Sequence, residues 1–186
     1  MIVTIWLLAI NSSLAFQRIS FSKRASFGFD VSSTKVDDKL EVEEYFNNEG
    51  FSRWNKIYSD SDEVNSVQKD IRTGHQQTID KVLGWIENEN NSLKTVCDAG
   101  CGVGSLALPM SAKFKKVFAS DISKSMTDEA AVRAKDCGLK NIEFKVSDME
   151  ALKGKYDTVT CIDVMIHYPT DKVYVTLYTN ITCLSY

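Results

Sequence analysis

Apolar positions recur every three or four residues between residues 36 and 90, which is the spacing of one helix face. The pattern predicts a helix over Asp37–Asn48 that ends at Gly50, and two further helices on either side of a break at Thr73-Gly74. Each helix has an apolar side and a polar side, so we expect it to pack against the chain on one side. Because this helical arm precedes every predicted strand, we expect it to cover a bound ligand as a lid.

From residue 94 onward, short β-branched and aromatic runs alternate with helical stretches. This alternation is typical of βαβ units and a parallel sheet. We therefore predict an α/β domain over residues 94–172 with about four parallel strands. The predicted strands are Thr95–Asp98, Lys116–Asp121, Ile142–Val146 and Tyr156–Ile162, and the predicted helices are Ser105–Lys113 and Ser123–Cys137, of which the second is closed by Gly138.

The composition is that of a folded and mildly acidic protein. Hydrophobic residues make up 44% and charged residues 25% of the 186 positions, and the formal net charge is -3. Without a broad basic face, the chain lacks the counterion-release attraction that drives nucleic-acid binding. We therefore predict no nucleic-acid partner.

The five cysteines show no framework spacing, and their odd number argues against a disulfide-stapled secreted domain. The two histidines are His75 and His167, and no cluster has the ligand spacing of a zinc site. We expect no metal site and reduced structural thiols, with a redox-sensing role for one thiol left open. The cysteines are Cys97, Cys101, Cys137, Cys161 and Cys183.

Residues 1–30 have the composition of a targeting segment. Ile2–Ile10 is an uninterrupted apolar run, but as a helix it would span only about 14 Å, so we expect no transmembrane helix and at most peripheral membrane association. The small residues of Ser13-Leu14-Ala15 suit signal peptidase, and the following segment is rich in Ser and basic residues, as transit peptides are. This order resembles the two-part presequence of algae with secondary plastids. We expect a plastid location, with plain secretion as the alternative.

A glycine-rich loop, Asp98–Gly104, follows the first predicted strand and opens a helix. Glycines allow a tight turn and remove side chains where a ligand must touch the main chain. The N–H groups at the helix start could hold an anionic group. However, a dinucleotide loop starting at Gly100 would need glycine where Ser105 stands, and a phosphate loop would need a lysine that is absent here. We therefore expect a ligand other than a polyphosphate.

Four carboxylates fall at the C-terminal ends of successive predicted strands, where open parallel sheets bind ligands. With the loop, they fit a positively charged, ribose-bearing ligand, S-adenosylmethionine. We expect Asp98 to face its amino group and Asp121 to accept its ribose hydroxyls. Asp148 would accept the adenine amino group, with Met149 packed on the ring. Helix capping explains any one of these acids but not the set. The predicted cofactor-binding residues are Asp98, Gly100, Cys101, Gly102, Gly104, Asp121, Ile122, Asp148, Met149 and Asp163.

Four stretches between residues 42 and 172 also carry a family resemblance. They are EYFNNEGFSRWNKIYSDSDEVNSVQKDIRTGHQQTIDKVLGWI, VCDAGCGVGSL, ASDIS and GKYDTVTCIDVMIHYP. They resemble the magnesium protoporphyrin IX methyltransferases, a family of class I S-adenosylmethionine-dependent enzymes. The resemblance implies a Rossmann-like class I methyltransferase fold and methylation of one propionate carboxylate of magnesium protoporphyrin IX. It also implies the large subunit of magnesium chelatase as a partner, and a location in the stroma or on the stromal face of plastid membranes.

By this resemblance, Tyr58 and His167 match positions implicated in the active site of the family. A carboxylate is already ionised and a sulfonium is already electrophilic, so catalysis would come mainly from in-line positioning and exclusion of water. Our hypothesis is that His167 orients the propionate and that Tyr58 closes over methyl donor and acceptor. The alternative for His167 is a helix-entry histidine bonded to backbone.

The arm is rich in aromatic residues, which would suit a flat macrocycle, although core packing explains them equally well. We expect Arg72 and His75 to border the pocket in which this macrocycle would bind. The aromatic residues are Tyr45, Phe46, Phe51, Trp54 and Tyr58.

After Lys172 the resemblance stops, and residues 173–186 form a divergent β-branched and aromatic tail. Because the family continues with a fifth strand and further elements, we expect an incomplete fold and a truncated gene model. The first alternative function is another small-molecule S-adenosylmethionine methyltransferase, and the second is a non-catalytic remnant that binds S-adenosylmethionine. A dehydrogenase is the third, and Ser105 opposes it.

Overall fold

The computed structural model describes residues 38–59, 61–87, 91–167 and 181–183. The predicted targeting segment 1–30 and most of the tail 173–186 lie outside these ranges. Within them, no helix combines the length and the apolar character that crossing a membrane requires.

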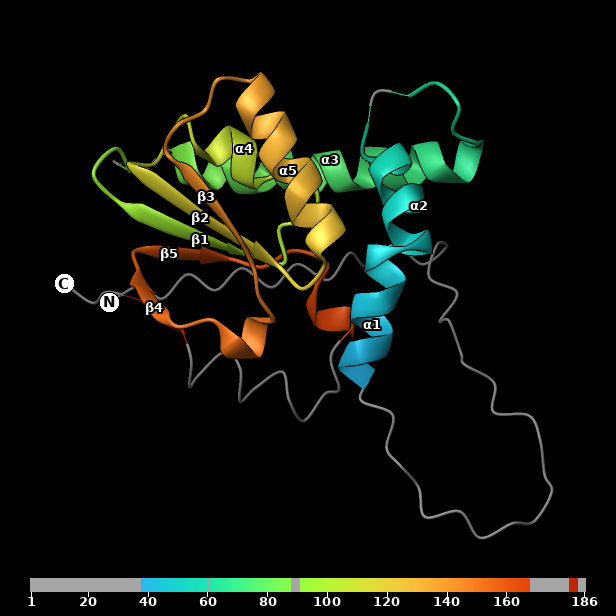
Figure 1. The fold of residues 1–186 in the computed structure, drawn as a ribbon. Coiled ribbons are helices and arrows are strands. Elements are labelled where there is room, and N and C mark those ends of the chain that lie inside the picture. Colours follow the sequence, from blue (N-terminus) through green and yellow to red (C-terminus); the bar gives the residue numbers. More distant parts are fainter. Residues whose placement is uncertain (1–37, 60, 88–90, 168–180, 184–186) are drawn as a thin grey trace, which may run out of the picture.

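A sheet of four parallel strands in the order β3-β2-β1-β5 forms the centre of the molecule (Figure 1). This confirms the predicted α/β class and the number of parallel strands. The first three strands match the predicted ranges to within one residue. The strands are β1 (Thr95–Ala99), β2 (Lys116–Asp121), β3 (Ile142–Val146) and β5 (Thr158–Thr160).

The fourth predicted strand, Tyr156–Ile162, is wrong in its extent. The chain forms two short strands here, β4 (Gly154–Tyr156) and β5, with a bend at Asp157 between them. The Asp157 carboxylate accepts hydrogen bonds from the backbone N–H and the hydroxyl of Thr95, at 2.7 and 2.9 Å. These bonds fix the start of β5 beside β1. The strand β4 instead pairs in parallel with β6 (Ile181–Cys183) in a second sheet.

Helices α3 (Ser66–Glu87), α4 (Ala107–Met110) and α5 (Lys124–Asp136) lie on one side of the sheet, and β4 lies on the other (Figure 1). The main core forms where Ile79 and Val82 of α3 meet Val96 and Val117 of the sheet. Each aliphatic side chain buried there contributes on the order of 1.5–3 kcal/mol to stability. The sheet is thereby a rigid support for the loops at its carboxyl edge.

The ends of α5 agree with the sequence. Ser123 caps its first turn, because its hydroxyl accepts the N–H of Met126 at 3.2 Å. Gly138 follows the last turn with a φ of 69°, the left-handed conformation that favours glycine. By contrast, α4 has four residues in place of the predicted Ser105–Lys113, and turns complete the segment.

The arm differs from its predicted helices at both glycines. Gly50 does not end a helix but lies inside α2 (Glu49–Ile57), which follows α1 (Asp38–Asn47) almost directly. A Cβ at Gly50 would lie 2.6 Å from the Tyr45 ring, so glycine allows the two helices to approach each other. At Gly74 there is no break, because α3 continues through it. The cost of one helical glycine, about 1 kcal/mol, is small beside the packing of α3 on the sheet.

The arm is bound to the start of α5 through Asn47. Its side-chain oxygen accepts the hydroxyl of Ser123 at 3.0 Å and the backbone N–H of Ser125 at 3.1 Å. The Ser125 hydroxyl donates to the Asn47 carbonyl at 3.0 Å. Helices α1 and α2 of the arm therefore lie at the carboxyl ends of the strands (Figure 1).

Candidate functional site

The glycine loop joins β1 to α4 at the carboxyl edge of the sheet. Gly100 has a φ of 78°, and a Cβ there would lie 2.0 Å from a methyl carbon of Val164. The N–H groups of Gly100 and Cys101 both donate to the Ser120 carbonyl, at 2.7 and 2.9 Å. These N–H groups are therefore used in holding the loop against β2. The predicted anion site at the start of the helix is not formed by them, which agrees with a ligand other than a polyphosphate.

Gly102 is the glycine of this loop that faces open space. Its φ is 51°, and a Cβ there would have no heavy atom of the described residues within 4 Å. The space beside Gly104 is filled instead, because a Cβ there would lie 2.1 Å from the Leu108 side chain. Bare main chain beside open space is what a ligand in contact with the backbone requires.

Asp98, at the end of β1, is a buried carboxylate with 3% of its surface exposed. Its Oδ1 accepts the Thr160 hydroxyl at 2.7 Å. Burial raises its pKa to about 6, while the bond from Thr160 acts in the opposite direction and the nearby Asp121 carboxylate raises it further. A cation bound here would remove much of the cost of keeping this carboxylate ionised.

Asp121, at the end of β2, joins the glycine loop to α5. Its two carboxylate oxygens accept the backbone N–H groups of Gly102 and Ser123, both at 2.9 Å. Burial raises the pKa of Asp121, and these backbone bonds oppose the rise. Each oxygen keeps a further lone pair with which a ligand hydroxyl can interact. Ile122, half-buried, lies between Asp121 and Ser123.

Asp148, after β3, is engaged by the arm. Its carboxylate forms an ion pair with the Lys39 ammonium of α1 at 2.6 Å, and Lys39 also forms an ion pair with Glu150. Its other oxygen accepts the N–H of Glu150 at 3.0 Å and caps the short helix η1 (Met149–Ala151). A ligand amino group at Asp148 would have to share it with Lys39. Met149 is buried in a second core cluster, where its sulfur lies 3.8 Å from the thiol of Cys161.

Asp163, after β5, has a φ of 59°, the sole left-handed conformation among the described non-glycine residues. Such backbone is uncommon outside glycine, asparagine and aspartate, and at functional sites it orients side chains. The Asp163 carboxylate lies 3.3 Å from Nδ1 of His75 on α3. Asp163 therefore faces the arm.

Tyr58 and His167 come to this region from different parts of the chain. Tyr58 follows α2 and stacks on His75, and burial together with Asp163 raises the pKa of its phenol. His167 ends the short helix η2 (Met165–His167), and its ring packs edge-on against Phe46 with centroids 5.1 Å apart. Desolvation lowers the pKa of His167, whereas Asp163 acts to raise it. Asp163 thus acts electrostatically on both predicted catalytic side chains.

Two arginines hold the end of α2 and hence the backbone of Tyr58. Arg72 donates from α3 to the Ile57 carbonyl at 2.6 Å and to two further carbonyls. Arg133 donates from α5 to the Tyr58 carbonyl at 3.3 Å. The last carbonyls of a helix lack helical partners, and guanidinium groups satisfy them well. The sequence pointed to Arg72 only as a residue at the border of the pocket, and it did not point to Arg133 or Lys39.

The buried thiols are poor nucleophiles. Burial raises the pKa of Cys101 well above its ordinary value and that of Cys161 to about 12. Both sulfurs are therefore protonated at neutral pH and unreactive. Among the described residues, no three His, Cys, Asp or Glu side chains lie together as metal ligands would.

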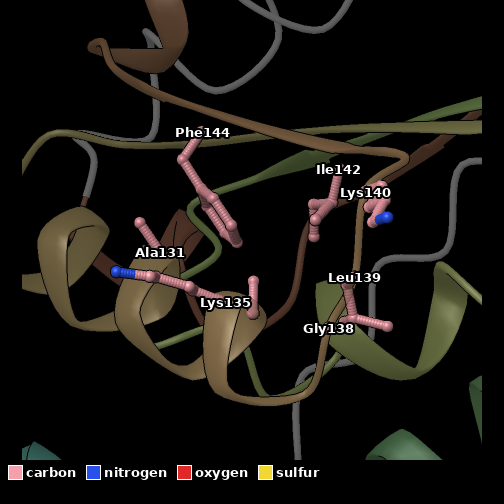
Figure 2. Close-up of a pocket in the computed structure, with 8 residues that line it drawn as sticks. Ala131, Lys135, Gly138, Leu139, Lys140, Ile142 and Phe144 are labelled. Atoms are coloured by element: carbon pink, nitrogen blue, oxygen red, sulfur yellow. The ribbon is translucent and has the colours of Figure 1, made fainter.

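A shallow groove elsewhere in the molecule is a poor candidate for the site. It lies between α5 and β3 (Figure 2) and is lined by small, apolar and basic residues. It borders the beginning of β3, whereas ligands of open parallel sheets bind at the carboxyl ends of the strands. The lining residues are Ala131, Ala134, Lys135, Gly138, Leu139, Lys140, Ile142 and Phe144.

The arrangement fits a cationic nucleoside. Asp121 is close enough to Asp98 to raise the pKa of Asp98, burial raises the pKa of both carboxyls, and the open backbone of Gly102 is bonded to Asp121. A positive ligand would relieve this concentration of negative charge, whereas a diphosphate would add to it.

Comparisons with known proteins identify the family. Residues 96–184 match a family described as a methyltransferase domain. The magnesium-protoporphyrin O-methyltransferase of Synechocystis sp. is 48% identical over 145 residues, which are 76% of this chain and 63% of the relative. The chloroplastic magnesium protoporphyrin IX methyltransferase of Arabidopsis thaliana is 52% identical over 139 residues, which are 73% of this chain and 44% of the relative. The chain thus spans less than two thirds of the length of these curated relatives.

A solved structure agrees in fold as well as in sequence. The magnesium protoporphyrin IX methyltransferase of Synechocystis, crystallised with bound SAM, superimposes with a TM-score of 0.73 at 47% identity. The match covers 78% of this chain and 71% of that one. It confirms the Rossmann-like methyltransferase fold with N-terminal helices. The shared fold and the sequence identity, together with the carboxylates at the strand ends, show that the chain belongs to the magnesium protoporphyrin IX methyltransferase family.

Proposed function

We propose that the chain binds S-adenosylmethionine at the carboxyl edge of the sheet, with Asp98 at the methionine amino group and Asp121 at the ribose hydroxyls. The observation that carries this proposal is the buried carboxylate of Asp98 together with the half-buried carboxylate of Asp121, which accepts the N–H of Gly102 where the backbone faces open space. Asp148 and Met149 would border the adenine, and Ile122 and Asp163 would complete the site. When bound, the cofactor supplies an electrophilic methyl group on its sulfonium.

We propose that the methyl acceptor is one propionate carboxylate of magnesium protoporphyrin IX. The transfer forms a methyl ester and leaves S-adenosylhomocysteine. Family membership supports this substrate, and so do the aromatic residues of the arm beside the site. Trp54 and Tyr58 lie with ring centroids 5.5 Å apart, and Phe46 contacts His167. Rings that are already in contact with one another can extend their stacking to a flat macrocycle.

The roles proposed for His167 and Tyr58 follow from this substrate. His167 would orient the propionate, because it lies at the edge of the arm and its lowered pKa favours the neutral imidazole, which can donate one hydrogen bond. Tyr58 would close over donor and acceptor, because its phenol stays neutral and its backbone is held at the end of α2. Both roles supply position and exclusion of water, which this reaction requires more than acid-base chemistry.

Product analysis tests the proposed function directly. The chain is incubated with S-adenosylmethionine and magnesium protoporphyrin IX, and the porphyrin is examined by liquid chromatography and mass spectrometry. We expect the monomethyl ester, with little product from metal-free protoporphyrin or from a panel of unrelated carboxylic acids. Ester formation on the panel instead of the porphyrin would indicate another small-molecule methyltransferase. Cofactor binding with no ester on any acid would indicate a protein that binds without turnover.

The affinity for S-adenosylhomocysteine should depend on pH through Asp98. In the free protein this carboxyl titrates near pH 6, and its ionised form is the one that binds the ligand ammonium. The dissociation constant should therefore be constant above pH 7 and increase about tenfold per unit as the pH falls below 6. Calorimetric titrations between pH 5 and 8 measure this. A constant affinity over that range would show that Asp98 does not face a cation.

We infer further that the protein acts in a plastid, in the stroma or on the stromal face of its membranes. The chloroplastic relative of Arabidopsis thaliana and the signal-like and transit-like halves of residues 1–30 support this location, and the two halves favour a secondary plastid. The large subunit of magnesium chelatase is the proposed partner, as the family resemblance implies. Membrane association would be peripheral.

A further inference from the structure

A histidine that the proposed mechanism does not use lies against the proposed catalytic tyrosine. The His75 ring stacks on the Tyr58 ring, with centroids 4.1 Å apart and 23° between the planes. At the edge of the same ring, Nδ1 of His75 lies 3.3 Å from the Asp163 carboxylate. Through this ring, the middle of α3 connects the end of α2 with the segment that follows β5.

Stability alone does not account for a histidine at this position. Nε2 of His75 is buried and has no hydrogen-bond partner among the described residues. A buried polar nitrogen left in this state costs on the order of 1–3 kcal/mol. An apolar ring of similar size would fill the same space and stack on Tyr58 without this cost. The imidazole is therefore explained better by its contact with Asp163 than by packing.

We propose that His75 is a positioning residue for methyl transfer, which holds the Tyr58 ring in place by stacking on it while Asp163 fixes the imidazole. This inference rests on the proposed function. The long helix α3 is packed on the sheet through Ile79 and Val82, so His75 has a rigid support. Tyr58 follows the last residue of a short helix, and its ring can rotate about its side-chain bonds unless a neighbour holds it.

The electrostatics of the site agree with this role. Asp163 raises the pKa of Tyr58, and His75 acts on the pKa of Asp98 in the opposite direction from burial. His75 is therefore close enough to influence the carboxylate proposed for the cofactor, and it stacks on the tyrosine proposed for the acceptor. A displacement of about 1 Å in such a region can cost about a hundredfold in rate.

Two variants separate stacking from the bond to Asp163. His75→Phe keeps an aromatic ring against Tyr58 and loses the bond, whereas His75→Asn keeps a donor near Nδ1 and loses the ring. We expect kcat to fall about tenfold or more in both, while the dissociation constant for S-adenosylhomocysteine changes by less than about threefold. We also expect His75→Phe to unfold at the same or a higher urea concentration than the wild type. Wild-type kcat in either variant, or parallel losses of stability and kcat in His75→Phe, would overturn the proposal.

A double-mutant cycle tests whether His75 acts through Tyr58. If it does, His75→Phe should lower kcat by less than about twofold once Tyr58→Ala is present, because the ring that it positions is gone. Independent losses that multiply would show that His75 has a separate role.

A measurement without turnover keeps this inference distinct from the proposed function. Nuclear magnetic resonance of the chain labelled with ¹³C-tyrosine reports the Tyr58 ring, which the stacked imidazole shields. The Tyr58 signal should move away from its wild-type position in His75→Asn more than in His75→Phe. An unchanged signal in His75→Asn would refute the positioning of Tyr58 by His75, whether or not the wild type forms the ester. Absence of ester from the wild type, with the expected shifts, would instead refute the proposed function.

Discussion

Gly100→Ala should destabilise the protein and disrupt the glycine loop of the site. A methyl group at Gly100 would lie 2.0 Å from one methyl carbon of Val164 and 3.0 Å from the other, so the segment after β5 or the glycine loop must move. The φ of 78° adds the cost of a left-handed alanine, about 1–2 kcal/mol, and overpacking adds about 1–3 kcal/mol. We expect the free energy of unfolding in urea to fall by about 2–5 kcal/mol, with loss of measurable S-adenosylhomocysteine binding.

Two other glycines provide matched controls for this change. Gly74→Ala, inside α3 where a Cβ would meet no atom within 4 Å, should stabilise the chain by about 0.5–1 kcal/mol and leave binding unchanged. Gly102→Ala should cost only about 1–2 kcal/mol of stability, from its left-handed φ, but should weaken binding because its Cβ enters the open space. If Gly100→Ala and Gly74→Ala behaved alike, the contact between Gly100 and Val164 would not determine the site.

Asp98→Asn should have opposite effects on stability and on ligand binding. Because the folded protein raises the pKa of Asp98 to about 6 from an ordinary value near 4, the free energy of unfolding falls as the pH rises from 4 to 6. At pH 7 the ionised Asp98 therefore lowers the free energy of unfolding by up to about 3 kcal/mol. An uncharged amide does not carry this cost. The amide oxygen can still accept the Thr160 hydroxyl. The variant should therefore unfold at a higher urea concentration than the wild type.

The same variant should bind S-adenosylhomocysteine about 30- to 150-fold more weakly, because a hydrogen bond to a charged partner contributes about 2–3 kcal/mol. It should also lose the dependence of affinity on pH between 5 and 7. Asp157→Asn is the matched control, since it weakens the bonds to Thr95 far from the site and should lower stability without affecting affinity. Undiminished affinity in Asp98→Asn would exclude Asp98 as the partner of the ligand ammonium.

The sequence predicted the elements whose signals are local. The first three strands, the start of α5 near Ser123 and its end at Gly138 each depend on neighbouring residues and agree with the structure. Gly50 and Gly74 were misinterpreted as helix ends because propensity does not reveal packing. The contact of Gly50 with Tyr45 and the packing of α3 on the sheet outweigh the low helix propensity of glycine.

The carboxylates of the site were predictable because parallel strands bring their carboxyl ends to one edge. The contacts between the arm and this edge were not. Lys39 and Asp148 are 109 residues apart, and His75 and Asp163 are 88 apart, with no spacing or periodicity that joins them. The role of Arg133 likewise depends on how α5 meets the end of α2. Such pairs form only once the chain has folded, and no local pattern in the sequence indicates them.

We propose above all that the carboxyl edge of this sheet binds a cationic nucleoside through Asp98, Asp121 and the bare backbone at Gly102. Isothermal titration of the chain with S-adenosylhomocysteine at pH 7.5 tests it most directly. We expect saturable one-to-one binding, with competition from S-adenosylmethionine and none from ATP or NAD. Absence of binding by a folded chain, or displacement of the ligand by ATP or NAD, would contradict it.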